Sequence, residues 1–101
     1  MPYQFGRLDH GYEWRPEPKI VIKQPPSTYL NAFLFDIIAH SRPALDYLVK
    51  TFGADQVYLG TDYPFDMGLP DPLGAVAAIE TTDEAGKALI SEGNAKAALG
   101  L

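Results

Sequence analysis

The sequence predicts an α/β fold that contains a βαβ unit of a parallel sheet. Two short apolar runs, at residues 33–39 and 56–60, are separated by a stretch with the apolar spacing of a helix. The first run is interrupted only by Asp36, and neither run alternates as a strand with one exposed face does, which favours strands buried on both faces. The order strand, helix, strand is typical of a βαβ unit.

Length and composition limit the chain to one small globular domain. Of its 101 residues, 47% are hydrophobic and 21% are charged, which is too apolar for a disordered segment. The net charge of -5 argues against nucleic acid as a partner. No apolar stretch approaches the roughly 20 residues that span a bilayer, so we expect no membrane partner either.

The absence of cysteine from the sequence excludes disulfides and cysteine metal sites. The first residues, MPYQFGR, lack the charged and then apolar segments of a signal peptide. A cytoplasmic location is therefore expected.

The first part of the chain, residues 1–28, holds more than half of the nine prolines and predicts an extended, loop-like arm. Within it, residues 19–23 (KIVIK) predict a short strand, which the nearby prolines would keep at a sheet edge. Ser27 then offers a cap for a short helix that leads into the first apolar run.

The helix between the two apolar runs has clear start and stop signals. Ser41 is the expected cap, Pro43 lies in the first turn, and Gly53 ends the helix. Its apolar positions follow the i, i+3, i+4, i+7 spacing: Leu45, Leu48, Val49 and Phe52.

The tail of the chain is predicted to be helical. Residues 71–80 are apolar enough for a packed helix, and Thr81 with Glu84 forms a capping box for a second helix that runs to about Ser91. Residues 93–101 are expected to close the chain as a short, alanine-rich helix.

Asp62 is the main candidate for chemistry. It follows the second apolar run, where the carboxyl ends of parallel strands carry functional residues, and Gly60 would allow close approach of the backbone. A carboxylate so placed can ligate a divalent metal or act as a general base. Alternatively, Asp62 accepts backbone hydrogen bonds in the turn before Pro64. Asp66 is expected to cap the next segment.

Two histidines and two arginines are further candidates. His10 and His40 form no HxH, HxxxH or HExxH pattern, so each can be a hydrogen-bonded structural residue or a ligand. Arg7 and Arg15 lie on the arm and could hold carboxylates in a bidentate manner. The alternative for the arginines is surface salt bridges with Asp9, Glu13 or Glu17.

Several motifs together resemble one family: FGRLDHGYEWRP, PPSTYL, FLFDIIAHS, YLGTDYPFDMG and GNAKAALGL. They are similar to the carboxyl-terminal part of the amidohydrolase-related (amidohydrolase 2) proteins, the metal-dependent hydrolases grouped with aminocarboxymuconate semialdehyde decarboxylase. The resemblance runs from about Tyr3 to Leu101, and GTDYPF is its most specific element.

The resemblance implies a (β/α)8 TIM barrel with a divalent metal, usually zinc, at its carboxyl face. Asp62 matches the family aspartate that binds this metal and takes or relays a proton. Arg7 and Arg15 match arginines that hold the carboxylates of a small substrate. His10 and His40 are not matched to metal ligands.

The sequence lacks the HxH pattern of the family metal site, and its 101 residues compare with roughly 250 in a whole barrel. We therefore expect a C-terminal fragment or a truncated reading frame, with an arm at residues 1–28 and the last two βα units and a helical tail at residues 29–101. Such a chain would not assemble the metal site or catalyse hydrolysis or decarboxylation alone.

Two other readings stay open. The chain could be a non-catalytic βαβ module that self-associates, which would make it a homo-oligomer, or that completes a longer homologue. It could also be a small carboxylate-binding domain that uses Arg7 and Arg15.

Overall fold

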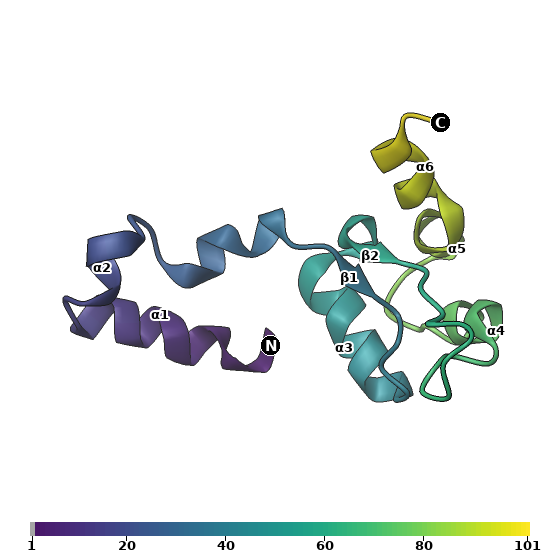
Figure 1. Ribbon diagram of the computed structural model, residues 1–101, viewed down its shortest axis with the longest axis horizontal. Coiled ribbons are helices and arrows are strands. Elements are labelled where there is room, and N and C mark those ends of the chain that lie inside the picture. The colour runs from purple at the N-terminus through teal and green to yellow at the C-terminus, as the bar shows by residue number, and fades with distance from the viewer. Residues whose placement is uncertain (1) are drawn as a thin grey trace. The chain divides into compact units, whose positions relative to one another are not determined.

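The computed structural model describes residues 2–101, and the chain forms two compact units. The first unit extends to Phe33 and the second is Leu34–Leu101, and each is described by itself. Helices and a short parallel sheet make the fold a mixed α/β type (Figure 1). Among the described residues, no helix combines the length and the apolar character that crossing a bilayer requires.

The first unit is helical, which corrects the prediction of an extended arm. A 3-10 turn (η1, Pro2–Gln4) leads into α1 (Phe5–Trp14), which is followed by α2 (Pro18–Val21) and by a second 3-10 helix (η2, Pro26–Ala32). The strand expected at residues 19–23 is wrong, because most of it lies in α2, with proline at the first turn of that helix. None of the described residues of this unit is buried.

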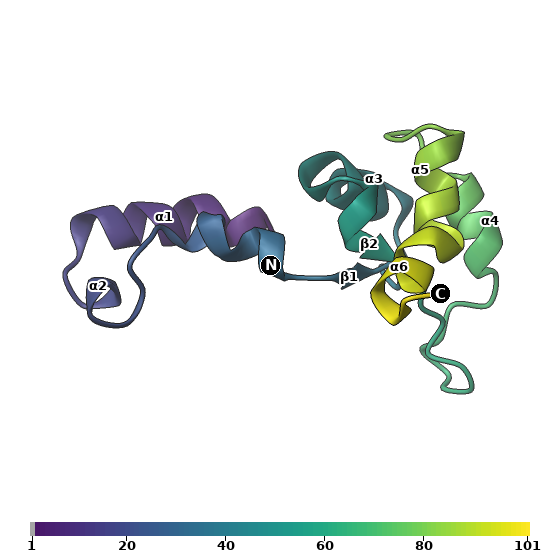
Figure 2. The same ribbon diagram turned by 90° about the horizontal axis from the view of Figure 1, so that it is seen from above.

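The packing of α1 along η2 holds the first unit together (Figures 1 and 2). The Asp9 carboxylate accepts a hydrogen bond of 2.8 Å from the Ser27 backbone N–H and so links the two helices. Ser27 is the second residue of η2, whose N-cap position is Pro25. The prediction of Ser27 as a cap is therefore wrong.

The second unit contains the predicted βαβ arrangement. β1 (Phe35–Asp36) and β2 (Val57–Tyr58) pair in parallel, with Phe35 opposite Val57 and Asp36 opposite Tyr58. α3 (Arg42–Phe52) connects them, followed by a 3-10 turn (η3, Ala54–Gln56). Figure 1 shows the two strands next to each other with α3 running beside them.

The strands are shorter and less buried than the sequence predicts. β1 covers only two residues of the expected run, and Asp36 on it is exposed. Phe33 and Leu34, just before it, are 50% and 63% exposed, so this run is not buried on both faces. The physical reason is that the sheet of the described residues has two strands, which give each apolar run few neighbours to pack against.

α3 follows its sequence signals closely. It begins after Ser41, has proline in its first turn and ends at Gly53, whose φ of 89° suits glycine. Ser41 occupies the N-cap position with an extended backbone but makes no side-chain cap hydrogen bond. Leu45 and Val49 are the buried residues of this helix.

The tail forms α4 (Pro72–Ala77), α5 (Glu84–Ala88), a π-helical turn (η4, Leu89–Gly93) and α6 (Asn94–Leu99), as predicted in kind (Figure 2). Thr81 is not the cap of α5. Asp83 is, because its carboxylate accepts a 2.8 Å hydrogen bond from the Gly86 N–H. The Thr81 hydroxyl instead donates to the Asp46 carbonyl of α3.

The core of the second unit lies between the sheet, α3 and the tail helices. Its buried residues are all aliphatic: Ile37, Leu45, Val49, Val57, Val76, Ile79 and Ile90. Asn94 is the buried polar residue among those described, and its side-chain amide donates to the carbonyls of Ala54 and Val57 at 2.7 and 2.8 Å. These bonds fasten α6 to the start of β2.

Candidate functional site

The candidate site lies where the chain leaves the carboxyl ends of β1 and β2. In parallel α/β folds this edge gathers functional side chains. Asp62 is the fourth residue after the end of β2, and His40 is the fourth residue after the end of β1. Because the register pairs Asp36 with Tyr58, His40 and Asp62 hold equivalent positions after neighbouring strands.

His40 and Asp62 share an unusual backbone conformation. Their φ values are 47° and 53°, in the left-handed region, and they are the described residues other than glycine with positive φ. This region costs an L-residue roughly 1–2 kcal/mol, although Asp and His adopt it more often than most. Strained backbone of this kind clusters at functional sites.

Glycine shapes the path from β2 to Asp62, as the sequence predicts for Gly60. A Cβ on Gly60 would lie 3.2 Å from the Asp36 Cβ, closer than most real contacts, and 3.4 Å from the Ile38 Cδ1. The segment that carries Asp62 therefore passes close against the end of β1.

Residues 61–69 form a closed loop with Asp62 near its start, which we call the Asp62 loop. The Leu69 N–H donates to the Thr61 carbonyl at 2.8 Å and closes the base of the loop. The Phe65 N–H donates to the backbone carbonyl of Asp62 at 2.8 Å, and the Gly68 N–H to the Phe65 carbonyl at 3.0 Å.

The carboxylate of Asp62 belongs to an exposed residue. The alternative reading of Asp62 as a turn aspartate expects its carboxylate to bind nearby N–H groups. Two of these groups bond elsewhere, because the Tyr63 N–H donates to the Thr61 hydroxyl oxygen and the Phe65 N–H to the Asp62 backbone carbonyl. The geometry thus favours a carboxylate presented outward at the sheet edge.

Asp66 does not cap the next helix. It lies exposed in the Asp62 loop, and the N-cap of α4 is Asp71, whose carboxylate accepts a 2.9 Å hydrogen bond from the Gly74 N–H. The loop is longer than the sequence suggests, and a second aspartate closer to Pro72 takes the capping position.

The two predicted substrate arginines both come from the first unit. Arg7 lies in α1 and Arg15 is its C-cap residue, two helical turns or about 12 Å apart, and both are exposed. The ion pairs of the described residues involve neither of them, so the predicted salt bridges with Asp9, Glu13 or Glu17 do not form.

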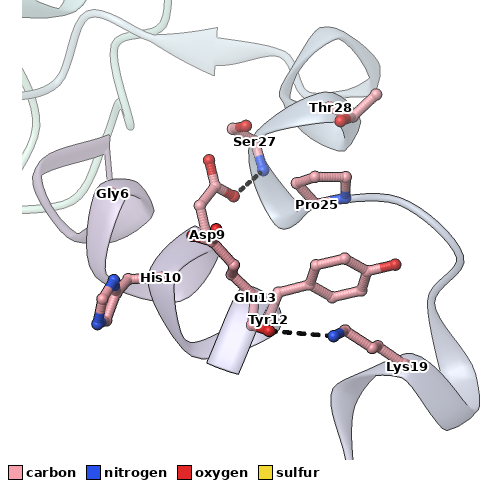
Figure 3. A pocket seen from close by; sticks show the side chains of 9 residues that line it. All are labelled: Gly6, Asp9, His10, Tyr12, Glu13, Lys19, Pro25, Ser27 and Thr28. Atoms are coloured by element: carbon pink, nitrogen blue, oxygen red, sulfur yellow. Dashed lines mark hydrogen bonds between the residues drawn. The ribbon is translucent and has the colours of Figure 1, made fainter. Parts of the chain in front are cut away.

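An open hollow of about 680 Å³ lies in the first unit between α1, α2 and η2 (Figure 3). Polar and apolar groups both line it, and the Lys19 ammonium donates to the Glu13 carbonyl at 3.1 Å while it lies 5.5 Å from the centroid of the Tyr12 ring. Its lining residues are Gly6, Asp9, His10, Tyr12, Glu13, Lys19, Pro25, Ser27 and Thr28. Neither predicted substrate arginine lines this hollow.

A smaller cavity of about 190 Å³ lies in the second unit beside His40. Its walls are mostly aliphatic side chains of the core, α3 and α4, and Arg42, which pairs with Glu80, lies among its polar residues. The lining residues are Ile37, His40, Ser41, Arg42, Leu45, Leu69, Ala75, Ala78 and Ile79.

The donor groups of the described residues do not complete a metal site. Across residues 2–101, no group of three or more His, Cys, Asp or Glu side chains is placed to hold a metal ion. A carboxylate such as that of Asp62 suits a divalent metal as one ligand, but bound metals in proteins usually have three or more protein ligands. The remaining ligands would have to come from residues outside this set.

Two proteins with the same name are similar to this chain. No family model matches the chain. The chain is 37% identical over 102 residues to a 2-amino-3-carboxymuconate-6-semialdehyde decarboxylase of Dictyostelium discoideum. The matched region covers 100% of this chain and 28% of the Dictyostelium protein. It is 36% identical over 64 residues to the Caenorhabditis elegans protein of the same name. That matched region covers 62% of this chain and 16% of the Caenorhabditis protein.

A solved structure has a similar fold. The apo IDCase of Metarhizium anisopliae matches 97% of this chain and 30% of its own chain, with a TM-score of 0.70 and 21% sequence identity. The chain thus spans less than a third of each of the relatives that it resembles. At this identity the structural match concerns the fold alone.

Proposed function

We propose that this chain, which belongs to the amidohydrolase-related family of the aminocarboxymuconate semialdehyde decarboxylases, forms the last two βα units of a (β/α)8 barrel and gives it one metal ligand, Asp62. The observation that carries the proposal is the position of Asp62. It lies just past the carboxyl end of β2, exposed, on a left-handed backbone. The similarity to the Dictyostelium decarboxylase extends over the whole chain and supports the same assignment.

The reaction class that fits is metal-dependent decarboxylation or hydrolysis of a small carboxylated substrate. A divalent metal, which we propose is zinc, would supply Lewis-acid chemistry in the complete barrel. Asp62 would hold the metal and accept a proton. Arg7 and Arg15 would bind substrate carboxylates, because a guanidinium matches a carboxylate with two parallel hydrogen bonds.

The chain alone would be inactive under this proposal. With one carboxylate ligand it offers too few donors to keep a metal, and the groups described form no larger cluster. Its partner would be the remainder of a barrel, in the same polypeptide or in another subunit.

A replacement experiment tests this proposal. The segment of the Dictyostelium decarboxylase that matches this chain would be exchanged for the chain, and the chimera analysed for zinc and for decarboxylation. We expect about one zinc per chimera and measurable turnover. Asp62→Ala should lower zinc affinity roughly 100-fold or more, since even outer-shell changes cost 10–100-fold. Asp66→Ala, an exposed aspartate of the same loop, is the matched control and should keep zinc and activity.

Two results would contradict the proposal. The first is a chimera that does not fold, because the chain would then fail to replace a segment of the barrel. The second is equal zinc content in the Asp62→Ala and wild-type chimeras. The 101-residue chain alone, titrated with zinc in a calorimeter, should show no saturable binding.

A second candidate function is favoured by the exposed apolar side chains of the second unit. Leu34, Tyr63, Phe65, Met67 and Leu73 are between 63% and 87% exposed. Contiguous exposed apolar surface marks interaction sites in soluble proteins. The chain would then be a non-catalytic βαβ module that self-associates or completes a longer homologue.

A further inference from the structure

The side chain of His40 connects the two loops that leave the carboxyl ends of β1 and β2. Its Nε2 lies 2.6 Å from the backbone carbonyl oxygen of Met67, which is on the Asp62 loop. A carbonyl oxygen can only accept, so Nε2 carries the proton and donates. The bond joins residues that are 27 positions apart in the sequence and lie on the loops after two paired strands.

The Asp62 loop is anchored firmly at its two ends. Leu59 before it and Leu69, its last residue, both pack against the hydrophobic core. The Leu69 N–H also closes the loop base on the Thr61 carbonyl. Between these anchors, the side chains of Tyr63, Phe65 and Met67 are exposed and give the loop little packing.

His40 bonds Met67, the last residue of this exposed part. The Met67 carbonyl that it binds is next to Gly68, where a Cβ would lie 2.8 Å from the Thr61 carbonyl oxygen and 3.3 Å from the Asp62 carbonyl oxygen. The bonded carbonyl therefore belongs to the part of the loop that folds back directly onto the backbone of Thr61 and Asp62. Gly68 leaves no room there for a Cβ, so the backbone beside Met67 lies close against that of Thr61 and Asp62.

The backbone of His40 is itself in the left-handed region and needs interactions that hold it there. Its φ of 47° turns the chain at the same register position as Asp62, whose φ is 53°. Such a conformation persists when surrounding interactions hold it. The hydrogen bond to the Asp62 loop is an interaction of this kind.

We propose that His40 is a positioning residue for Asp62, which it keeps in place through the Met67 carbonyl. The inference rests on the proposed function, in that Asp62 is taken to be a metal ligand. His40 itself touches neither metal nor substrate in this account. Its contribution is the orientation of the loop from which the carboxylate extends.

The first test uses the full 101-residue chain and amide hydrogen exchange. The reporters are the Phe65 and Leu69 amides, whose bonds to the Asp62 and Thr61 carbonyls form the loop. His40→Leu removes the donor, and we expect both amides to exchange about tenfold faster. His40→Gln places an amide N–H at a similar distance from the backbone and should stay within about twofold of the wild type.

Two further variants sharpen this test. His40→Asn also removes the bond, since its side chain is shorter, yet Asn adopts the left-handed region readily, so it serves if His40→Leu fails to fold. His10→Leu is the matched control, because His10 lies in α1 and its ring is tilted against that of Trp14, with the centroids 5.8 Å apart, instead of binding the loop. Its loop amides should exchange as in the wild type.

The second test uses the decarboxylase chimera loaded with cobalt as a spectroscopic probe. A residue with a general structural role would not change the cobalt spectrum when its variant is as stable as the wild type. We expect His40→Leu to lower cobalt affinity about tenfold and to shift the d–d bands, as loss of an outer-shell partner does, and His40→Gln to restore both.

Each result decides the inference. Unchanged exchange of Phe65 and Leu69 in both His40→Leu and His40→Asn would overturn it, as would faster exchange with an unaltered cobalt site. If the wild-type chimera binds no cobalt, the proposed function fails, and the exchange data alone then decide whether His40 holds the loop.

Discussion

Asp62 carries its carboxylate on a left-handed backbone, and this conformation allows the proposed metal-binding role to be tested separately from a role in folding. An aspartate in this region costs the fold roughly 1–2 kcal/mol relative to an ordinary backbone position. Glycine adopts the region without a Cβ penalty and is the residue that folding alone would favour there. An aspartate at a position that glycine would fill at lower cost is consistent with a functional role for its carboxylate.

Asp62→Gly is therefore expected to leave the chain as stable as the wild type or slightly more stable, while it removes the proposed metal ligand. Asp66→Gly is the matched control, because Asp66 has no positive φ. That change should lower the free energy of unfolding by about 0.4–1 kcal/mol, since glycine raises the entropy of the unfolded chain. Urea unfolding measures both. A larger loss for Asp62→Gly than for Asp66→Gly would show that the turn, and not a ligand, needs the aspartate.

Asn94 is a second residue whose surroundings define its contribution. It is 6% exposed, and its amide bonds the carbonyls of both Ala54 and Val57. Asn94→Ala should lower the free energy of unfolding by about 1–3 kcal/mol, because the Ala54 and Val57 carbonyls each lose a hydrogen bond inside the fold. Asn31→Ala, at an exposed position of η2, should change it by less than about 0.5 kcal/mol. Thermal or urea unfolding compares the two, and equal losses would contradict this role.

At the scale of elements, the accuracy of the sequence analysis depends on how local the signals are. α3 is predicted well because Pro43, the apolar spacing and Gly53 all lie within the helix or next to it. α1 is missed because it contains two glycines and has no side-chain cap, so its formation depends on contact with η2. Thr81 is misassigned because Asp83, two residues later, caps α5.

Glycines in two helices allow an element-scale test of local against tertiary control. A Cβ on Gly11 of α1 meets nothing within 4 Å, whereas a Cβ on Gly86 of α5 would lie 1.9 Å from the Thr82 Oγ1 and 3.2 Å from the Ala54 Cβ. Gly11→Ala should raise the free energy of unfolding of the first unit by about 0.5–1 kcal/mol through helix propensity.

Gly86→Ala should instead lower the free energy of unfolding by about 1–3 kcal/mol because it overpacks the second unit. Circular dichroism during denaturation follows both changes. Stabilisation by both substitutions would mean that helix propensity outweighs packing at Gly86 as well.

At the scale of the whole molecule, the sequence predicts the position of Asp62 after a strand but not the contacts around its loop. Asp62 can be located because a strand, a glycine and a carboxylate follow one another in the chain. The bond from His40 to Met67 cannot, because it joins two loops that become neighbours only when β1 and β2 pair. A lone histidine after a strand carries no sign of its partner.

The exposed apolar side chains of the second unit lead to a prediction about association. Phe65 and Met67 are 74% and 68% exposed, and each could gain about 1.5–3 kcal/mol when an interface covers it. If the chain is a self-associating module, its sedimentation coefficient should rise with concentration, and a Phe65→Ser/Met67→Ser double variant should weaken association about 100-fold or more.

The matched control is Leu99→Ser/Leu101→Ser, which removes two residues that are 73% and 86% exposed at the other end of the second unit. These changes should leave association unaltered if the Asp62 loop forms the contact. A monomer at every concentration would exclude the self-associating module. Association that survives both double variants would place the contact elsewhere, because the loss of two apolar anchors from a shared interface lowers affinity measurably.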